Sequence, residues 1–270
     1  MLYLCATPIG NLEDMTFRAI RILREVDLIA AEDTRRTRKL LTHFEIHTPL
    51  IRFDENCKEI AAEKILQRLQ AGESVAIVSD AGLPAISDPG ANLVRMAIDA
   101  GITVCPIPGA NAALSALICS GLDTSKFLFA GFAPKTKKNR REFLQKLSTA
   151  EETIIFYEAP HRLKDFLSEL AEIFGDRQIV LARELTKVHE EFLRGRITEL
   201  AEKLDEPRGE FVVLVEGKKI SESPPEENLL EFYRKLLAQG LDKKSAMREA
   251  AKKFNVSRRE IYNTLLREEI

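Results

Sequence analysis

Residues 75–90, VAIVSDAGLPAISDPG, decide the fold, because an apolar β-rich run ends here in a loop of small and polar residues. The run 75–78 has strand character, and a helix-like run, 91–100, begins directly after the loop. Small residues allow backbone N–H and C=O groups to approach a ligand closely. The stretch therefore predicts an α/β unit with a ligand site at the end of a strand.

The same rhythm of short β-rich runs and longer amphipathic runs extends on both sides of this stretch. Strand-like runs lie at 2–6, 28–31 and 103–107, and helix-like runs at 15–26, 60–71 and 110–120. Gly72 and Gly101 each stand between a helical run and a strand, where a helix end needs a residue that tolerates positive φ. Parallel strands with helical crossovers are therefore predicted for an N-terminal α/β domain, residues 1–112.

A second α/β domain is predicted for residues 113–220, where the rhythm restarts. A helix-like run lies at 163–174, and strand-like runs lie at 127–130, 153–156, 178–182, 191–194 and 211–216. The run 191–194 fits an antiparallel edge ribbon, so this sheet is predicted to be mixed.

A third part of the chain begins after a polar, proline-containing break formed by Ser221, Ser223, Pro224 and Pro225. The break predicts a linker at 221–227 and a small helical domain at 228–270. Ser257 and Glu260 have the spacing of a capping box for the last helix. The final two helices resemble a helix-turn-helix unit whose exposed side would carry Arg258, Arg259, Tyr262 and Asn263. Nucleic-acid binding and a docking bundle both fit this domain.

The composition is that of an ordinary globular protein, with 45% apolar and 30% charged residues. No signal peptide and no apolar run of bilayer length is recognised, so a cytoplasmic protein without a membrane partner is expected. The cysteines, scattered without CxxC pairs, predict no metal site; they are Cys5, Cys57, Cys105 and Cys119.

The net charge of −2 conceals two cationic clusters, which fit an RNA partner. They are Arg35, Arg36, Arg38 and Lys39, and Lys135, Lys137, Lys138, Arg140 and Arg141.

Two further loops follow predicted strands and contain small residues. Residues 7–11, TPIGN, fit a ligand loop, although Pro8 and Gly10 also fit a simple tight turn. Residues 107–112, IPGANA, repeat the layout of strand, turn and helix, although their alanines also fit close helix–sheet packing. Asp80 is a candidate acceptor for a ligand hydroxyl or ammonium, whereas Asp88 fits a helix N-cap.

Two charged segments also follow predicted strands. Residues 32–39, EDTRRTRK, place cations in the first turn of a helix, where the macrodipole disfavours them. A solvated face is the usual role of such a run, but its position at a strand end favours a phosphate partner. Residues 156–162, FYEAPHR, gather Glu158, His161 and Arg162 at a turn, without the pattern of a metal site or a hydrolase.

The chain resembles the ribosomal RNA small subunit methyltransferase I family, which belongs with the tetrapyrrole (class III) methylases. The resemblance covers residues 3–218 and rests on six motifs in this order: TPIGNLED, AEDTRRTRKLL, SDAGLPAISDPG, PGANAA, GFAPK and FYEAPHR. It implies two α/β domains with S-adenosylmethionine in the cleft between them, and usually a homodimer. The cofactor contacts that it implies are Pro8, Val78, Ser79, Asp80, Leu83, Asn111, Ala112, Tyr157, Glu158, Leu181 and Ala182.

The activity implied by the resemblance is methylation of a cytidine ribose 2′-hydroxyl at the decoding site of 16S ribosomal RNA, with S-adenosylhomocysteine as the product. Tetrapyrrole-acting relatives carry a GGDP-like loop where this chain has SDAG at 79–82, which favours the RNA branch. A base near the ribose would help, and Asp33 and Glu158 are the candidates. No metal is required.

The cationic clusters are expected to hold RNA phosphates through Arg35, Arg36, Arg38, Lys135, Lys137, Lys138, Arg140 and Arg141. Two alternatives stay open at this point. One is a methylase of a tetrapyrrole or another small molecule, and the other is a non-catalytic RNA-binding protein.

Overall fold

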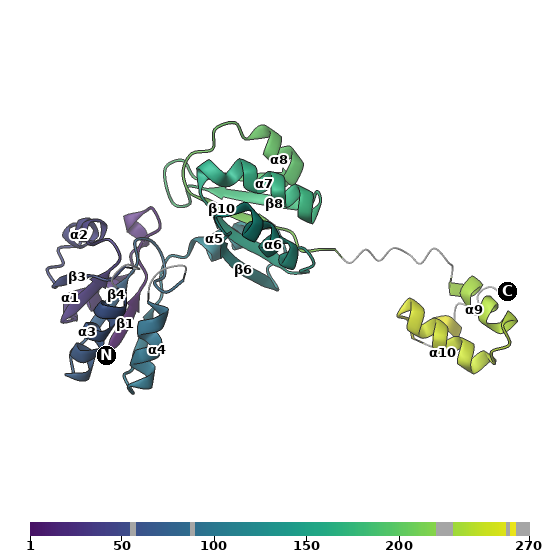
Figure 1. The fold of residues 1–270 in the computed structure, drawn as a ribbon, viewed down its shortest axis with the longest axis horizontal. Coiled ribbons are helices and arrows are strands. Elements are labelled where there is room, and N and C mark those ends of the chain that lie inside the picture. The colour runs from purple at the N-terminus through teal and green to yellow at the C-terminus, as the bar shows by residue number, and fades with distance from the viewer. Residues whose placement is uncertain (55–57, 87–89, 220–228, 258–259, 263–270) are drawn as a thin grey trace. The chain divides into compact units, whose positions relative to one another are not determined.

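The computed structural model describes residues 1–54, 58–86, 90–219, 229–257 and 260–262. Contacts between Cα atoms divide the chain into a body, Met1–Lys218, and a C-terminal unit, Lys219–Ile270. The body contains two five-stranded sheets, one in each half of its sequence (Figure 1).

The first sheet is parallel throughout, as the alternation of strands and helices predicts. Its strands are β1 (Leu2–Cys5), β2 (Leu28–Ala31), β3 (Leu50–Arg52), β4 (Val75–Val78) and β5 (Val104–Ile107), in the order β3-β2-β4-β1-β5. Because β1 and β4 are neighbours, the loops that follow them leave from the same edge of the sheet.

Helices cover both faces of this sheet. Those on one face are α1 (Phe17–Glu25) and α2 (Thr34–His43), and those on the other are α3 (Lys58–Gln70) and α4 (Ala91–Asp99). Ile29 and Ala31 of β2 point into the first core, whereas Leu28 and Ala30 point into the second. Burial on both faces explains why the central strands are apolar throughout.

The predicted helix ends are confirmed at Gly72 and Gly101, which have φ of +92° and +71°. The sequence pattern does not predict β3, because three residues are too few to establish a period. Gly90 directly precedes α4, and the predicted N-cap Asp88 lies outside the described residues, as does Cys57.

The second sheet is mixed, as predicted. Its strands are β6 (Phe127–Phe132), β7 (Thr153–Glu158), β8 (Gln178–Arg183), β9 (Glu191–Arg196) and β10 (Phe211–Val215), in the order β6-β7-β10-β8-β9. Only β6 and β7 are parallel, and β9 is the predicted antiparallel edge strand.

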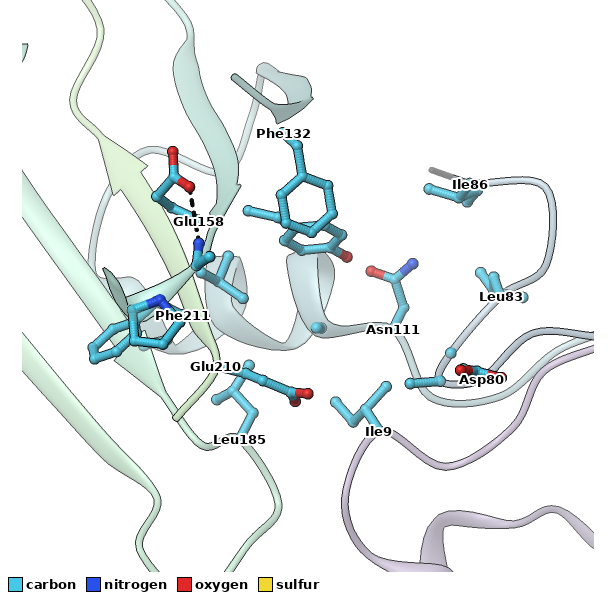
Figure 2. A pocket seen from close by; sticks show the side chains of 18 residues that line it. Ile9, Asp80, Leu83, Ile86, Asn111, Phe132, Glu158, Leu185, Glu210 and Phe211 are labelled. Atoms are coloured by element: carbon cyan, nitrogen blue, oxygen red, sulfur yellow. Dashed lines mark hydrogen bonds between the residues drawn. The ribbon is translucent and has the colours of Figure 1, made fainter. Parts of the chain in front are cut away.

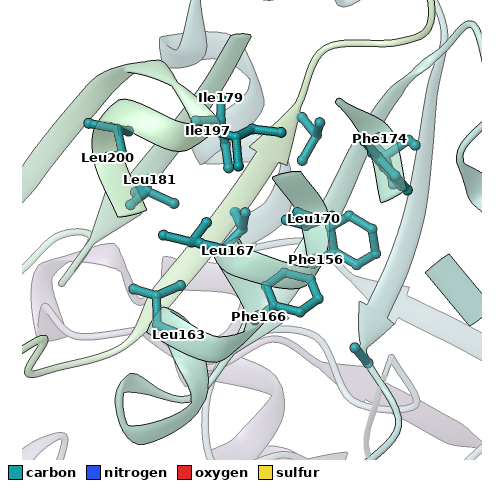
Figure 3. Packing of buried hydrophobic residues seen from close by; sticks show 14 of the residues in the cluster. Phe156, Leu163, Phe166, Leu167, Leu170, Phe174, Ile179, Leu181, Ile197 and Leu200 are labelled. Atoms are coloured by element: carbon teal, nitrogen blue, oxygen red, sulfur yellow. The ribbon is translucent and has the colours of Figure 1, made fainter. Parts of the chain in front are cut away.

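The two faces of the second sheet have different partners. Three helices cover one face and enclose its larger core (Figure 3): α6 (Lys137–Leu147), α7 (Pro160–Phe174) and α8 (Ile197–Lys203). The other face packs against α5 (Ala112–Ser120), whose chain arrives directly from the first sheet. Residues that alternate along a strand therefore enter different surroundings, so Phe156 joins the larger core while Tyr157 lies on the α5 side.

The C-terminal unit contains α9 (Leu229–Ala238) and α10 (Lys243–Phe254), which pack through Leu230, Tyr233, Ala246 and Ala250. The predicted capping box is present, since the Ser257 N–H donates to Glu260 Oε2 and the Glu260 N–H donates to Ser257 Oγ. Tyr262 is exposed, whereas Arg258, Arg259, Asn263 and the predicted linker 221–227 lie outside the described residues. Among the described helices, none is long and apolar enough to cross a membrane.

Candidate functional site

Two of the loops singled out in the sequence are joined at the edge of the first sheet. The Thr7 N–H donates to the Gly82 carbonyl at 2.9 Å, and the Gly82 N–H donates to the Thr7 carbonyl at 3.0 Å. The Thr7 hydroxyl also donates to the Ser79 carbonyl at 3.1 Å. Gly82 has φ of +79°, a conformation that glycine adopts without strain. These bonds fix the loop after β1 against the loop after β4.

A cavity of about 350 Å³ lies between these loops and the α5 side of the second sheet (Figure 2). Its volume falls within the range usual for small-molecule sites, about 300–1,000 Å³. The loops of the first sheet contribute Ile9, Asp80, Gly82, Leu83, Asn111 and Ala112 to the walls. The second sheet contributes Phe132, Tyr157, Ala182, Leu185, Glu210 and Val212. The walls are largely apolar with a few polar groups, as is typical of a pocket for a small organic ligand.

Asn111 is the N-cap residue of α5 and faces the cavity (Figure 2). Its Oδ1 accepts a hydrogen bond from the Leu114 N–H at 2.9 Å, which caps the helix. No bond of its amide nitrogen is found among the described residues, so this group is a candidate donor to a ligand.

Asp80 lies at the junction of the cavity and a smaller groove of about 240 Å³. Its Oδ1 accepts a hydrogen bond from the Asp33 N–H at 3.0 Å, and its Oδ2 lies 3.3 Å from Arg36 Nη1. The groove is also lined by Thr7, Pro8 and Lys39. Asp80 thus combines a negative charge in the cavity wall with a link to the cationic helix α2.

Most of the cofactor contacts expected from the sequence lie together around the cavity: Asp80, Leu83, Asn111, Ala112, Tyr157, Glu158 and Ala182. The others lie elsewhere. Pro8 and Ser79 line the smaller groove. Val78 is buried in the first sheet's core, and Leu181 points into the core under α6 and α7, opposite to Ala182. The side chains of Pro8, Ser79, Val78 and Leu181 are therefore not part of the cavity wall.

Glu158 borders the cavity with a side chain that is turned away from it. Its neighbour Tyr157 lies on the α5 side, so the Glu158 carboxyl lies on the opposite face of the strand, and its side chain is 0% exposed. Its Oε1 accepts from the Ala159 N–H at 2.9 Å, and Oε2 has no hydrogen-bond partner within the described parts of the chain. Burial raises the pKa of this carboxyl, while the Ala159 N–H and Arg162 act in the opposite direction. This placement argues against Glu158 as the base that contacts a substrate.

Asp33 is also a poor candidate for a base. Its carboxylate caps α2 by accepting from the Arg35 N–H at 2.8 Å, and it forms two further bonds to the Arg35 guanidinium. The Arg35 guanidinium and N–H hold the pKa of Asp33 well below its usual range. A carboxylate with so low a pKa is a weak proton acceptor, and Asp33 does not line the cavity.

The two cationic clusters differ in how far their charges are neutralised. Arg140 is buried and forms two 2.7 Å hydrogen bonds to Glu169, and Arg141 is paired with Glu172. This pairing argues against Arg140 as a phosphate ligand, and Arg141 is a weak candidate. Lys135, Lys137 and Lys138 are exposed in that cluster.

In contrast to Arg140, the cationic side chains of α2 are accessible to solvent. Arg35 and Arg36 form ion pairs but have side chains that are 87% and 68% exposed. Arg35 and Arg38 line a shallow depression together with Lys39, Thr42 and His43. Lys39 also lines the groove beside Asp80, so it connects the two surfaces.

Sequence reasoning missed several wall residues: Ile9, Ile86, Phe132, Leu185, Glu210 and Val212. Ile9 and Phe132 lie inside motifs that the resemblance uses, so proximity to those motifs could have found them. Leu185 and Glu210 carry no local signal, because only the pairing of β8 with β10 brings their segments together.

In the described part of the chain, no group of three or more His, Cys, Asp or Glu side chains is arranged to hold a metal ion.

Solved structures that superpose on this chain include a diphthine synthase and a uroporphyrin-III C-methyltransferase. Diphthine synthase superposes with a TM-score of 0.61 at 15% identity, covering 80% of this chain and 90% of that one. Uroporphyrin-III C-methyltransferase from Thermus thermophilus, complexed with S-adenosyl homocysteine, gives 0.56 at 19% identity, covering 80% and 97%. At these identities the likeness establishes the fold.

Curated relatives are much closer in sequence. Ribosomal RNA small subunit methyltransferase I of Bacillus subtilis is 51% identical, covering 97% of this chain and 93% of the relative. The protein of the same name from Synechocystis is 47% identical, covering 98% and 97%. The family model of the tetrapyrrole (corrin/porphyrin) methylases matches residues 1–201. The chain therefore belongs to the tetrapyrrole methylase family and, within it, to the ribosomal RNA small subunit methyltransferase I proteins.

Proposed function

We propose that this chain is an S-adenosylmethionine-dependent methyltransferase that methylates the ribose 2′-hydroxyl of a decoding-site cytidine in 16S ribosomal RNA. The observation that carries the proposal is the cavity between the loops of the first sheet and the α5 side of the second, in a chain of this family. The cytoplasm as location and a homodimer as the functional state are parts of the same proposal, the homodimer as implied by the family resemblance.

The cavity fits S-adenosylmethionine in size and in chemistry. The apolar side chains of Leu83, Tyr157 and Ala182 suit an adenosine moiety. The carboxylates of Asp80 and Glu210 suit the cationic and hydroxyl groups of the same molecule. At Gly82 a Cβ would lie 3.4 Å from Ile9 Cγ2, an ordinary contact, so glycine is required here by its φ of +79° rather than by lack of space.

When bound, S-adenosylmethionine supplies an electrophilic methyl group on its sulfonium. The loops after β1, β4 and β5 hold the reacting groups in a fixed geometry, which can contribute about 7–11 kcal/mol to a methyl transfer between two molecules. The Thr7–Gly82 bonds make the first two loops one rigid unit, and the apolar walls exclude water from the reacting centre. We assign no general base, since Asp33 and Glu158 are both engaged elsewhere.

The decisive test uses labelled S-adenosylmethionine and small ribosomal subunits that lack the modification. Mass spectrometry of the digested nucleosides should find label on a 2′-O-methylcytidine. Free 16S RNA and assembled subunits should be compared, so that the form of the substrate is also identified. Label on a tetrapyrrole alone would favour the small-molecule alternative, and RNA binding without transfer would favour a non-catalytic protein.

The RNA is proposed to contact the cationic face of α2. Replacement of Arg38 and Lys39 with alanine should weaken RNA binding and reduce the slope of log K against log salt by about 1.4, because each phosphate contact with a single strand contributes about 0.7. Filter binding at four salt concentrations measures the slope. The matched control replaces Lys203 and Arg208, two exposed cations outside the depression, and should leave the slope unchanged. Equal slopes for the two double variants would contradict the assignment of α2.

A further inference from the structure

We propose that Phe132 is a stacking platform for a nucleobase of the RNA acceptor strand, and that Arg162 holds this platform in position. The inference rests on the proposed function and assigns roles to the two family motifs, GFAPK and FYEAPHR, that the cofactor cavity only partly explains. Phe132 belongs to the first motif and Arg162 to the second.

Phe132 has the position expected of a side chain that meets a ligand at the mouth of a cavity. It is the last residue of β6, it lines the cavity, and it is 56% exposed (Figure 2). Its ring centroid lies 5.5 Å from that of Tyr157 at an interplanar angle of 61°. Tyr157 in turn contacts Phe129 edge to face at 5.1 Å. The Phe132 ring is thus supported from one side and open on the other.

An aromatic ring with one open face at the mouth of a cavity is available to stack on a flat ligand group. Cations follow directly in the chain at Lys135, Lys137 and Lys138, and they keep their exposed positions while Arg140 is buried. An aromatic platform next to cations is the combination with which proteins bind single-stranded nucleic acid, because the base stacks while the phosphates are neutralised. This favours a base of the acceptor strand over the adenine of the cofactor.

Arg162 fixes the backbone that carries Phe132. Its Nη2 donates to the Ala133 carbonyl at 3.0 Å and to the Pro134 carbonyl at 3.1 Å. A second arginine, Arg140, donates from Nη1 to the Lys135 carbonyl at 3.4 Å. Three consecutive carbonyls after Phe132 are therefore held by guanidinium groups from α6 and α7, so the loop cannot turn away without breaking these bonds.

Glu158 completes the brace. Its Oε1 lies 3.4 Å from Arg162 Nε and also accepts from the Ala159 N–H, so it fixes the guanidinium at the start of α7. The Glu158 carboxyl is fully buried and does not enter the cavity. Its contact with Arg162 accounts for an acidic residue at this position. Glu158 and Arg162 are positioning residues, whereas Phe132 contacts the substrate.

The experiment compares single and combined variants of the full chain in steady-state methyl transfer. Phe132→Ala should raise KM for the RNA substrate about tenfold, as expected for loss of one stacked base. The dissociation constant of S-adenosylhomocysteine, measured by calorimetry, should rise by a smaller factor than this KM, since Phe132 lies at the mouth of the cavity. Phe132→Trp should retain the wild-type KM, because an indole also stacks. The control is Phe127→Ala, which removes another exposed phenylalanine of β6 that does not line the cavity.

Arg162→Lys tests the brace, since a lysine ammonium cannot reproduce the planar contacts of a guanidinium with two carbonyls. It should also raise KM for RNA, and the Phe132→Ala/Arg162→Lys double variant should be no worse than Phe132→Ala alone. Additive effects would overturn the positioning role of Arg162. A weaker affinity for S-adenosylhomocysteine with an unchanged KM for RNA would assign Phe132 to the adenine instead. If the wild-type protein transfers no methyl group to any RNA, the proposed function itself is rejected. The KM and affinity results of the variants test this inference separately.

Discussion

Ala112→Phe is expected to weaken binding of S-adenosylmethionine strongly while the protein stays folded. Ala112 is the first residue of α5, is half-buried against the core on the α5 side of the second sheet, and lines the cavity, so a larger side chain would take up part of the cavity. A phenyl ring would occupy a substantial part of a cavity of about 350 Å³. Because ligand and ring cannot share this volume, the dissociation constant should rise by about 100-fold or more, equal to about 2.7 kcal/mol. Calorimetry with S-adenosylhomocysteine measures it directly.

A matched control lies two residues further along the same helix. Leu114→Phe adds a ring at a position that is 45% exposed and does not line the cavity, so cofactor affinity should be unchanged. Thermal unfolding of both variants should follow that of the wild type within a few degrees, which separates a filled site from a damaged fold. Wild-type affinity in Ala112→Phe would mean that the cofactor binds elsewhere.

Arg140→Ala should destabilise the protein by about 3–5 kcal/mol, the cost of leaving one partner of a buried ion pair uncompensated. The side chains of Arg140 and Glu169 are 10% and 9% exposed, and two hydrogen bonds of 2.7 Å join them. Removal of the guanidinium leaves the Glu169 carboxylate buried without its partner. Urea unfolding followed by circular dichroism gives the free energy of unfolding. The double variant Arg140→Met/Glu169→Leu should recover most of the loss, because no charge is then left buried.

Arg141→Ala is the natural comparison, because Arg141 and Glu172 join the same two helices through a similar two-bond geometry. Glu172 is 59% exposed, so water can replace the lost partner, and the cost should be no more than about 1 kcal/mol. Equal losses for Arg140→Ala and Arg141→Ala would show that burial does not determine the strength of these pairs.

The Arg140 pair also has a defined dependence on pH. Hydrogen bonds from Arg140 lower the pKa of Glu169 in the folded protein relative to an unfolded value of about 4.3. A carboxyl with a lowered folded pKa stabilises the protein above its unfolded pKa, and this stabilisation is lost as the pH falls towards the folded pKa. The contribution of this pair to the free energy of unfolding of the wild type should therefore be full near pH 7 and should decrease as the pH falls below about 4.3.

The sequence by itself determined the class of fold and the loops that form the site. The apolar run at β4 and the glycines that end helices predict a parallel α/β unit, since these signals act over a few residues. The ends of neighbouring parallel strands always meet at one edge of a sheet. The loops TPIGN and SDAGLP could therefore be expected to form one site, and Thr7 and Gly82 join them.

The tertiary structure alone decided which side chains enter the cavity. Alternation along β7 places Tyr157 and Glu158 on opposite faces of the sheet. The sequence does not indicate which face packs against α5 and which packs against α6 and α7. The same holds for the cations, since Arg140 and Lys138 look alike in the sequence until α7 places Glu169 against Arg140. Such choices depend on contacts between residues far apart in the chain, and local residue patterns carry no information about them.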